Sequence, residues 1–445
     1  MNPAKLSSAP ADSVVPAKPA YPPVRLAFMM WGMAVGFYLF GFFHRVTPAV
    51  LTSELMRDFK LSAAMLGNLS AFYFYFYAAM QIPTGILVDR FGPRTLLWIG
   101  ALIGGIGALM FAFADDFTSA AIGRGLIGGT VAVAWVSMLK LSSHWFDSRR
   151  LGTVTGIALA IGTMGAVLAG LPLRALSDAF GWQTVIAASG FVALCLALAI
   201  FFLMRDDPCE LGFESHAFAG GERKPASMSS ILRGLGEIWR YPNVALLFWV
   251  PSGIVGAFLT FTGLWGVPFL VQLHGMTPKS ASLITSGMLI AFSAGAILFG
   301  HLGDRWRRRK SPYVLGGVCV VLGFGGLWAM PGAPLPVLVP LLMLAGLGSG
   351  SMALGFLYVK ESLPLRLSGT AVGAVNMGVM VGPLTQQPVI GWILDRYWDG
   401  ALQNGVRLYG TEAYRMAFAF LVIWVLTAFV ALLLTRDTFG KQYRE

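Results

Sequence analysis

The sequence is poor in cysteine and in charge. It has 3 cysteines among 445 residues, and Asp, Glu, Lys and Arg together make up only 12%. Cys195, Cys209 and Cys319 stand too far apart for a disulfide framework or a metal-ligand spacing. The sequence also lacks a Walker-type G-x-x-x-x-G-K-[ST] pattern, a nucleophile triad and a metal-ligand cluster. We therefore expect no catalytic residue, no cofactor and no metal site, and we do not expect an enzyme.

Apolar residues, by contrast, are abundant. They make up 56% of the chain, and the mean hydropathy is +0.70, which no soluble domain of this size would show. Runs of about 20 apolar residues match the length of a helix that spans a bilayer. The sequence thus predicts an all-α membrane protein with twelve transmembrane helices in the lipid bilayer, at residues 26–51, 63–88, 95–114, 118–143, 151–175, 183–204, 244–272, 281–303, 312–330, 335–359, 369–394 and 414–435.

The net charge of +11 follows the connections between these runs and does not indicate a nucleic-acid site. Arg149, Arg150 and the run 305–310 lie in even-numbered connections, whereas the connection after the third run holds Asp115 and Asp116. The positive-inside rule then places both termini in the cytoplasm of a multi-pass protein of the cell (inner or plasma) membrane. The first residues lack a signal-peptide pattern, so we expect a disordered cytoplasmic tail there.

A weak internal repeat organises the chain. The pattern G-x-L-x-D-R-x-x-x-R occurs at residues 85–94 and again at 300–309. This duplication predicts two pseudo-symmetric six-helix bundles with a substrate site at the midplane between them. The expected parts are a tail at 1–24, bundles at 25–204 and 243–436, a cytoplasmic linker at 205–242 and a tail at 437–445.

With this duplicated pattern, the chain from Leu26 to Arg436 resembles the major facilitator superfamily. The resemblance implies a secondary transporter that works by alternating access, and we expect it to act as a monomer. It also implies that charged residues of the loops form a latch that holds the cytoplasmic side closed; the alternative is that they only anchor the loops at the headgroups. The gating candidates are Asp89, Arg90, Arg94, Arg150, Asp304, Arg305, Arg309 and Arg366.

Phe43-His44-Arg45 and the run 76–85 resemble the anion:cation symporter branch, which carries sugar acids and other organic carboxylates. The resemblance implies a small organic anion as substrate. That branch has acidic residues at the positions that correspond to His44 and Val131. Since no Asp or Glu lies deep in an expected span, proton coupling would need His44, whose imidazole titrates near neutral pH, or a proton carried by the substrate. His44 could equally face a partner helix as a neutral hydrogen-bonding residue.

Arg45 lies well inside the first hydrophobic run, where a charge costs at least roughly 2.5 to 3.5 kcal/mol. It either faces an aqueous cavity or extends its guanidinium to the interface. In a cavity, its planar fork would bind a carboxylate bidentately. Tyr73, Tyr77 and Gln81 follow at i, i+4 and i+8, so they share one helix face. We expect them in the substrate site, unless the tyrosines only pack.

Four further residues complete the expected substrate site, namely Lys140, Trp265, Asn376 and Gln387. Lys140 could instead extend to the interface, because a lysine stem reaches it easily. An organophosphate exchanger is the first rival function, but such carriers usually place a second arginine in the seventh helix, where Trp265 stands. A multidrug cation exporter ranks lower because the deep charges are positive. A transporter-like sensor and a membrane-embedded enzyme are the remaining alternatives.

Overall fold

The computed structural model describes residues 21–147, 149–217, 228–403 and 405–443. Most of the expected tail at 1–24 lies outside these ranges. The first half of the chain forms α1 (Val24–Val50), α2 (Thr52–Asp58), α3 (Ala63–Ala112), α4 (Phe117–Trp145), α5 (Leu151–Leu168), α6 (Leu171–Phe180) and α7 (Trp182–Leu203). A short helix η1 (Pro208–Leu211) and α8 (Met228–Ile238) belong to the segment that joins the halves.

The second half forms α9 (Pro242–Thr260), the π-helical turn η2 (Phe261–Trp265), α10 (Gly266–His274), α11 (Pro278–Trp306), α12 (Lys310–Ala329), α13 (Leu335–Ser349), α14 (Met352–Glu361), η3 (Leu365–Leu367), α15 (Ser368–Arg396) and α16 (Thr411–Leu434). Between α15 and α16, strands β1 (Leu402–Gln403) and β2 (Val406–Arg407) pair antiparallel, with Leu402 opposite Arg407.

Several helices differ in extent from the expected spans. The second and third spans are two helical segments that join as α3 across a kink at Gly92, where φ is +80°. Glycine adopts this conformation without a side-chain clash. The span expected at 151–175 is divided at Gly170 into α5 and α6, and the span at 335–359 is divided after Ser349 into α13 and α14.

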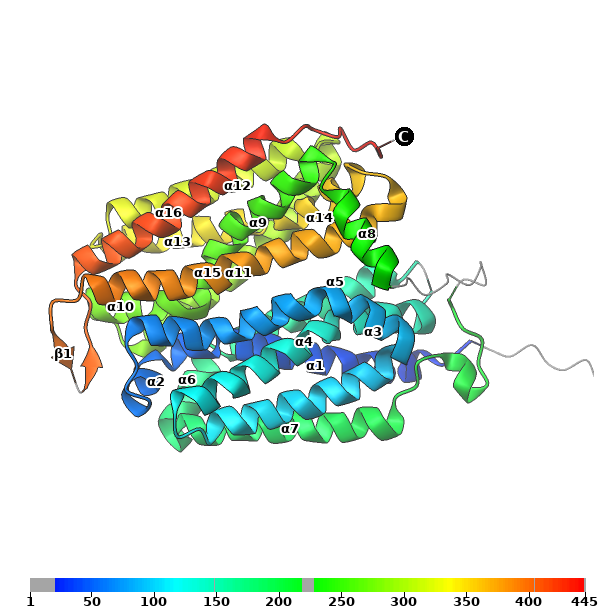
Figure 1. Ribbon diagram of the computed structural model, residues 1–445, viewed down its shortest axis with the longest axis horizontal. Helices are drawn as coiled ribbons and strands as arrows, with labels where there is room; N and C mark the ends of the chain where they lie inside the picture. Colours follow the sequence, from blue (N-terminus) through cyan, green and yellow to red (C-terminus); the bar gives the residue numbers. More distant parts are fainter. Residues whose placement is uncertain (1–20, 148, 218–227, 404, 444–445) are drawn as a thin grey trace, which may run out of the picture.

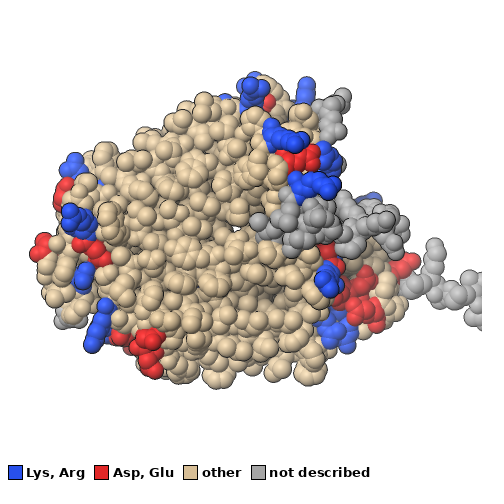
Figure 2. All heavy atoms as spheres, in the orientation of Figure 1, with Lys and Arg blue, Asp and Glu red and all other residues tan. Residues whose placement is uncertain are grey.

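Helices α1 to α7 form one layer and α9 to α16 form the other, with α3 and α15 side by side between them (Figure 1). Charged side chains gather at the two ends of the molecule, and uncharged atoms cover the belt between them (Figure 2). We call the end that carries Val24, α8 and Leu434 the terminal face, and the end that carries α2 and β1 the opposite face.

Ten helices of the described residues are long and apolar enough to cross a membrane. The candidate spans include Pro83–Ala112 of α3, whereas the expected span 369–394 in α15 is not among them. Polar side chains, including Asn376 and Gln387, lower the hydropathy of α15. Because α15 packs on α3, this polar helix lies at the boundary between the layers.

The layers meet tightly at the opposite face. Gly67 of α3 and Gly391 of α15 allow the two backbones to touch, since a Cβ at either position would overlap a carbonyl oxygen of the other helix. Nearer the terminal face, glycines of the same two helices lie beside open space. A Cβ added at Gly85 of α3 or at Gly373 of α15 would meet no described atom of a neighbouring segment within 4 Å.

Part of the segment expected as a C-terminal tail, 437–445, packs against the terminal face. The Thr438 hydroxyl donates to Glu361 Oε2 at 2.6 Å, and the Tyr443 N–H donates to the Glu361 carbonyl at 2.9 Å. The described tail residues therefore hold the end of α14.

Candidate functional site

Arg45 is the central feature of the site. It lies in the last turns of α1 and is only 6% exposed. Its Cζ lies 4.3 Å from the centroid of the Phe42 ring and 5.4 Å and 5.8 Å from those of Tyr77 and Tyr73. In the part of the chain that the structure describes, no carboxylate forms an ion pair with Arg45, and its buried Nε has no hydrogen-bond partner. Aromatic rings stabilise the cation, but its charge is left without a counter-ion.

Tyr73 and Tyr77 come from neighbouring turns of α3, and their rings stack with centroids 6.1 Å apart. The Tyr73 hydroxyl donates to the Gly41 carbonyl of α1 at 3.1 Å. No hydrogen bond to the Tyr77 hydroxyl is recorded among the described residues. Tyr73 therefore ties α3 to α1, whereas Tyr77 keeps its hydroxyl available for a ligand beside Arg45.

Arg124 of α4 is a second buried cation, with no exposed surface. Its Nη1 donates to the His44 carbonyl at 2.6 Å and its Nη2 to the Ser70 carbonyl at 3.4 Å. Its Cζ lies 5.3 Å from the Tyr73 ring, so Tyr73 is a neighbour of both arginines. The sequence prediction did not include Arg124, although its depth in an apolar run was a visible signal.

The His44 side chain points away from the arginines and tyrosines of the site and towards α7. Its Nε2 lies 3.0 Å from Ser189 Oγ of α7, and its ring packs against Phe40 at a centroid distance of 4.4 Å. The side chain has no exposed surface, and its buried Nδ1 has no hydrogen-bond partner among the described residues. The structure thus places the proton-coupling candidate in the interior of the first layer.

Gln81 and Asn376 meet across the two layers. Asn376 Nδ2 of α15 donates to Gln81 Oε1 of α3 at 2.9 Å. The other hydrogen bonds that join the two halves in the described ranges involve Ser62, Ala63 and Ala64 at the opposite face. Among the described polar contacts between the layers, the Gln81–Asn376 bond is therefore the one farthest from the opposite face.

Trp265 and Gln387 belong to the second layer and lie near Arg45, since a Cβ added at Gly263 would be 3.5 Å from Gln387 Nε2 and 3.8 Å from the Arg45 carbonyl oxygen. Trp265 Nε1 donates to the Gln387 carbonyl at 3.1 Å. The Gln387 side chain is fully buried, and neither of its amide atoms has a hydrogen-bond partner in the described ranges. A buried amide left unpaired costs about 1–3 kcal/mol, so Gln387 has unused capacity for a ligand or water.

Lys140 lies with the gating residues instead of with Arg45. Its Nζ donates to Asp89 Oδ1 at 2.9 Å and to the Val88 carbonyl at 3.0 Å. Arg90 lies over the Phe91 ring at 5.3 Å. The Arg94 side chain donates to the Phe201 carbonyl. The structure thus joins Asp89 to a cation of its own layer.

The second copy of the loop pattern is also paired within its layer. Arg309 contacts Asp304 at 3.0 Å and Glu361 at 2.9 Å. Arg366 Nη1 donates to Glu237 Oε2 of α8 at 3.0 Å, which connects the linker helix to the second layer. Arg305 is exposed at the end of α11. In both halves, the aspartate of the loop pattern thus forms an ion pair with a cation of its own layer, Asp89 with Lys140 and Asp304 with Arg309.

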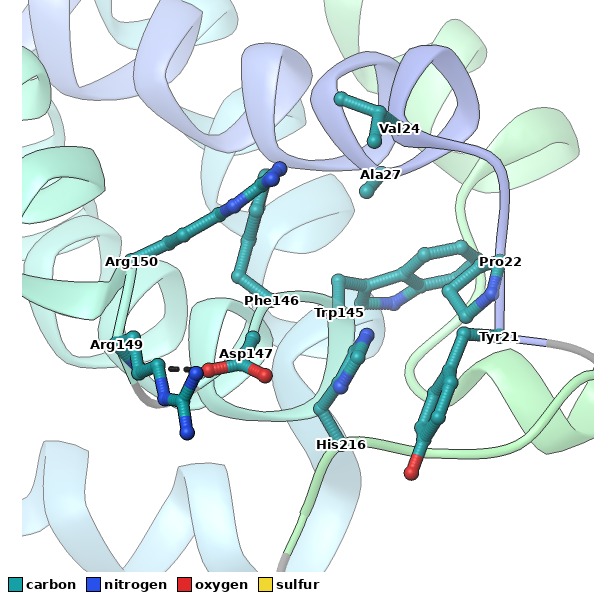
Figure 3. A pocket seen from close by; sticks show the side chains of 10 residues that line it. All are labelled: Tyr21, Pro22, Val24, Ala27, Trp145, Phe146, Asp147, Arg149, Arg150 and His216. Carbon is teal, nitrogen blue, oxygen red and sulfur yellow. Dashed lines mark hydrogen bonds between the residues drawn. The ribbon is translucent and has the colours of Figure 1, made fainter.

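Arg150, the last gating candidate, lines a hollow of 360 Å³ on the terminal face. Its side chain extends towards the first turns of α1, near Val24 and Ala27 (Figure 3). On another wall, Tyr21 stacks on His216 with centroids 4.3 Å apart. Neither this hollow nor one of 440 Å³ on the opposite face includes Arg45.

Comparison with known proteins gives a consistent assignment. The model of the family described as "Major Facilitator Superfamily" matches residues 26–276 and 253–444. A "Probable sulfoacetate transporter" of Cupriavidus necator is 24% identical over 398 residues, which cover 84% of this chain and 88% of the relative. A "Probable galactarate/D-glucarate transporter" of Escherichia coli strain K12 is 25% identical over 79% of this chain and 84% of its own length.

A "Glycerol-3-phosphate transporter" of Bacillus subtilis is 24% identical over 78% of this chain and 81% of the relative. Among solved structures, a bacterial homolog of the human lysosomal transporter Spinster, in an inward-facing and unoccupied conformation, superposes with a TM-score of 0.74 at 16% identity. The match covers 93% of this chain and 97% of that chain. It confirms the predicted fold class.

Proposed function

Because the chain belongs to the Major Facilitator Superfamily, we propose that it carries a small organic anion, a carboxylate, across the membrane by alternating access. The family match confirms the resemblance predicted from the duplicated loop pattern. The protein is a multi-pass membrane transporter and not an enzyme. The observation that carries the proposed substrate class is the uncompensated charge of Arg45.

An anion would supply the missing partner. A buried cation is costly unless it is paired and hydrogen-bonded, and the described carboxylates leave Arg45 unpaired. A ligand carboxylate could accept two parallel hydrogen bonds from the guanidinium and a third from the Tyr77 hydroxyl. The amides of Gln81, Asn376 and Gln387 suit hydroxyl groups on the rest of the ligand. The relatives named for sulfoacetate and for galactarate/D-glucarate support this ligand chemistry.

An organophosphate is the second candidate, and the glycerol-3-phosphate relative favours it. A phosphate monoester carries up to two charges and would need a second cation in contact with it. In the seventh helix, where organophosphate exchangers usually have a second arginine, this chain has Trp265. Arg124 is fully buried, and two of its nitrogens already donate to carbonyl groups. Arg45 is then the one cation left to contact the ligand, and a single cation favours the carboxylate.

We further propose that the terminal face is cytoplasmic, in the inner or plasma membrane of the cell. In that orientation the layers touch on the outside and separate towards the cytoplasm, so the protein faces inward. In this inward-facing state, the gating aspartates are paired within their own layers, as Lys140–Asp89 and Arg309–Asp304. We propose a monomer, since each half supplies one side of the site.

Proton coupling in this proposal does not pass through His44, because that side chain has no exposed surface. A proton that accompanies the anion would be carried by the substrate's own carboxyl group. The pH dependence of transport would then reflect the protonation of the substrate and not that of a protein side chain.

Uptake into proteoliposomes tests the function directly. Carboxylates, sulfonates, phosphate monoesters and organic cations are compared at equal concentration, after a thermal-shift screen in detergent. A ligand at about 100 times its Kd stabilises the folded state by roughly 2.7 kcal/mol. We expect a carboxylate to give both stabilisation and uptake. Uptake of phosphates or cations alone would refute the substrate class, and stabilisation without uptake of any ligand would indicate a sensor.

A further inference from the structure

At the opposite face, a side chain of one layer caps a helix of the other. The Asp395 carboxylate, at the end of α15, accepts hydrogen bonds from the Ala63 N–H at 3.1 Å and from the Ala64 N–H at 2.8 Å. These are the first two residues of α3. The partners are 332 and 331 positions apart in the sequence and belong to different halves of the chain.

Two side chains of the second half hold this carboxylate in place, and a third holds one of these two. The Tyr409 hydroxyl donates to Asp395 Oδ1 at 2.8 Å and accepts the Ala63 N–H at 3.2 Å. Arg407 Nη1, from β2, donates to the same Oδ1 at 3.0 Å. The Tyr409 N–H in turn donates to Gln272 Oε1 of α10 at 3.1 Å. Asp395 is therefore oriented before it meets the first layer.

The first N–H groups of an α-helix have no partner inside the helix, and the helix dipole makes this end positive. A carboxylate is consequently a favourable cap for it. The Ser62 side chain, at the N-cap of α3, accepts the Met65 N–H at 3.3 Å and also forms a hydrogen bond with Asp395. The N–H groups of Ala63 and Ala64 depend on the other layer, so this capping exists only while the opposite faces of the two layers touch.

We propose that Asp395 is the latch of the gate at the opposite face, and that its capping of α3 stabilises the state in which that face is closed. This inference rests on the proposed function, in that alternating access requires the face to open. Asp395 acts on transport through the position of α3, as a positioning residue. When the layers separate, the first turn of α3 and the Asp395 carboxylate both become accessible to water.

The first test measures the gate without any substrate. Cys195, Cys209 and Cys319 are replaced, spin labels are attached at Phe113→Cys and Met330→Cys, and pulsed electron paramagnetic resonance gives the distance distribution. Both labelled positions are exposed and lie in different halves at the opposite face. We expect Asp395→Asn to raise the ratio of the long-distance to the short-distance population by about tenfold. An unchanged distribution would overturn the proposal.

Asp116→Asn is the matched control. Asp116 also lies at the opposite face and its carboxylate accepts a helix N–H, that of Ser119 at 2.7 Å, but both residues belong to the start of α4 in the first layer. Loss of this carboxylate therefore removes no contact between the layers. We expect the control to keep the wild-type distribution, and an equal shift in both variants would attribute the effect to general loosening of the face.

The second test removes the donor instead of the acceptor. Ala63 is the first residue of α3, where proline is tolerated because its missing N–H has no intrahelical partner. Ser62 already has φ −77° and ψ 169°, a conformation compatible with a following proline. We expect Ala63→Pro to shift the distribution in the same direction as Asp395→Asn. The two shifts should be less than additive, because they remove the same contact.

The two proposals fail separately. If no anion is transported but both variants shift the distance distribution, the latch stands and the substrate proposal falls. If an anion is transported while Ala63→Pro leaves the distribution unchanged, the capping mechanism is overturned and the function remains.

Discussion

Gln81 and Asn376 share a hydrogen bond of 2.9 Å across the boundary between the two halves. Gln81 follows Tyr77 by one helical turn, and Tyr77 is the neighbour of Arg45. One turn of helix rises about 5.4 Å, so a ligand on Arg45 and Tyr77 would lie next to this bond. This hydrogen bond would therefore be affected both when a ligand binds and when the two halves separate.

We expect Gln81→Ala and Asn376→Ala each to weaken ligand binding several-fold. The double variant should be no weaker than the more impaired single variant, because each substitution already breaks the shared bond. Binding is measured by titration calorimetry in detergent. Losses that add fully would mean that the two amides act independently.

Arg45→Lys should reduce transport at least tenfold while the protein remains folded. The lysine keeps the charge but not the planar fork that binds a carboxylate bidentately. Uptake is compared with that of Arg25→Lys, an exposed arginine of the same helix, which should match the wild type. Wild-type uptake by the Arg45 variant would show that its guanidinium geometry does not matter.

Asp89→Asn should slow turnover about tenfold and leave ligand affinity within a few fold. Asp89 and Lys140 side chains are 48% and 30% exposed, and such pairs contribute only about 0.2–1 kcal/mol to stability. The melting temperature should therefore hardly change. Asp115→Asn, at the opposite face, serves as the control. A collapse of affinity together with turnover would contradict a gating role.

His44→Gln should retain the wild-type response of uptake to an imposed pH gradient. Glutamine can keep a hydrogen bond to Ser189, and the wild-type imidazole has no exposed surface through which to exchange protons. Uptake is measured at matched internal pH with and without a gradient. Loss of the response in this variant alone would identify His44 as the proton carrier.

Two adjacent carboxyl groups outside the spans should have opposite pH effects on stability. Burial raises the pKa of Asp206 above its ordinary 3.8, although the Arg94 N–H opposes this shift. Its stabilising contribution is complete below pH 3.8 and is lost as the pH rises through the raised pKa. Asp206→Asn should therefore increase the melting temperature at neutral pH, with a difference that shrinks in acid.

At Asp207, burial also raises the pKa, but hydrogen bonds from the Cys209 N–H and the His144 side chain outweigh it and leave the pKa below 3.8. This carboxylate stabilises the fold above pH 3.8, and the contribution is lost as the pH falls through the lowered pKa. Asp207→Asn should thus decrease the melting temperature at neutral pH. Thermal unfolding between pH 5 and 8 measures both variants, and shifts of the same sign would contradict the assignment.

Sequence patterns predicted the helical fold because apolar runs and their breaks are local signals. They also predicted a span at 369–394, which forms part of the continuous helix α15 although this helix is not among those apolar enough to be candidate spans. The hairpin of β1 and β2 was missed, since its two-residue strands carry almost no periodic pattern.

The site was only partly accessible to sequence reasoning. The depth of Arg45 and the shared face of Tyr73 and Tyr77 follow from helical spacing. The direction of His44 does not, because neighbours on a helix point about 100° apart and only packing decides which one faces the boundary. Lys140 could not be placed either, since its long stem reaches Asp89 from a different helix.

The capping of α3 has an evolutionary consequence. The second half contributes specific side chains, including Asp395, Arg407 and Tyr409, whereas the first half contributes one side chain, that of Ser62, and the backbone N–H groups of Ala63 and Ala64. Every amino acid except proline supplies a backbone N–H. Substitutions at Ala63 and Ala64 can therefore accumulate without compensating changes in the other half, and mutational sensitivity at this contact should fall mainly on the second half.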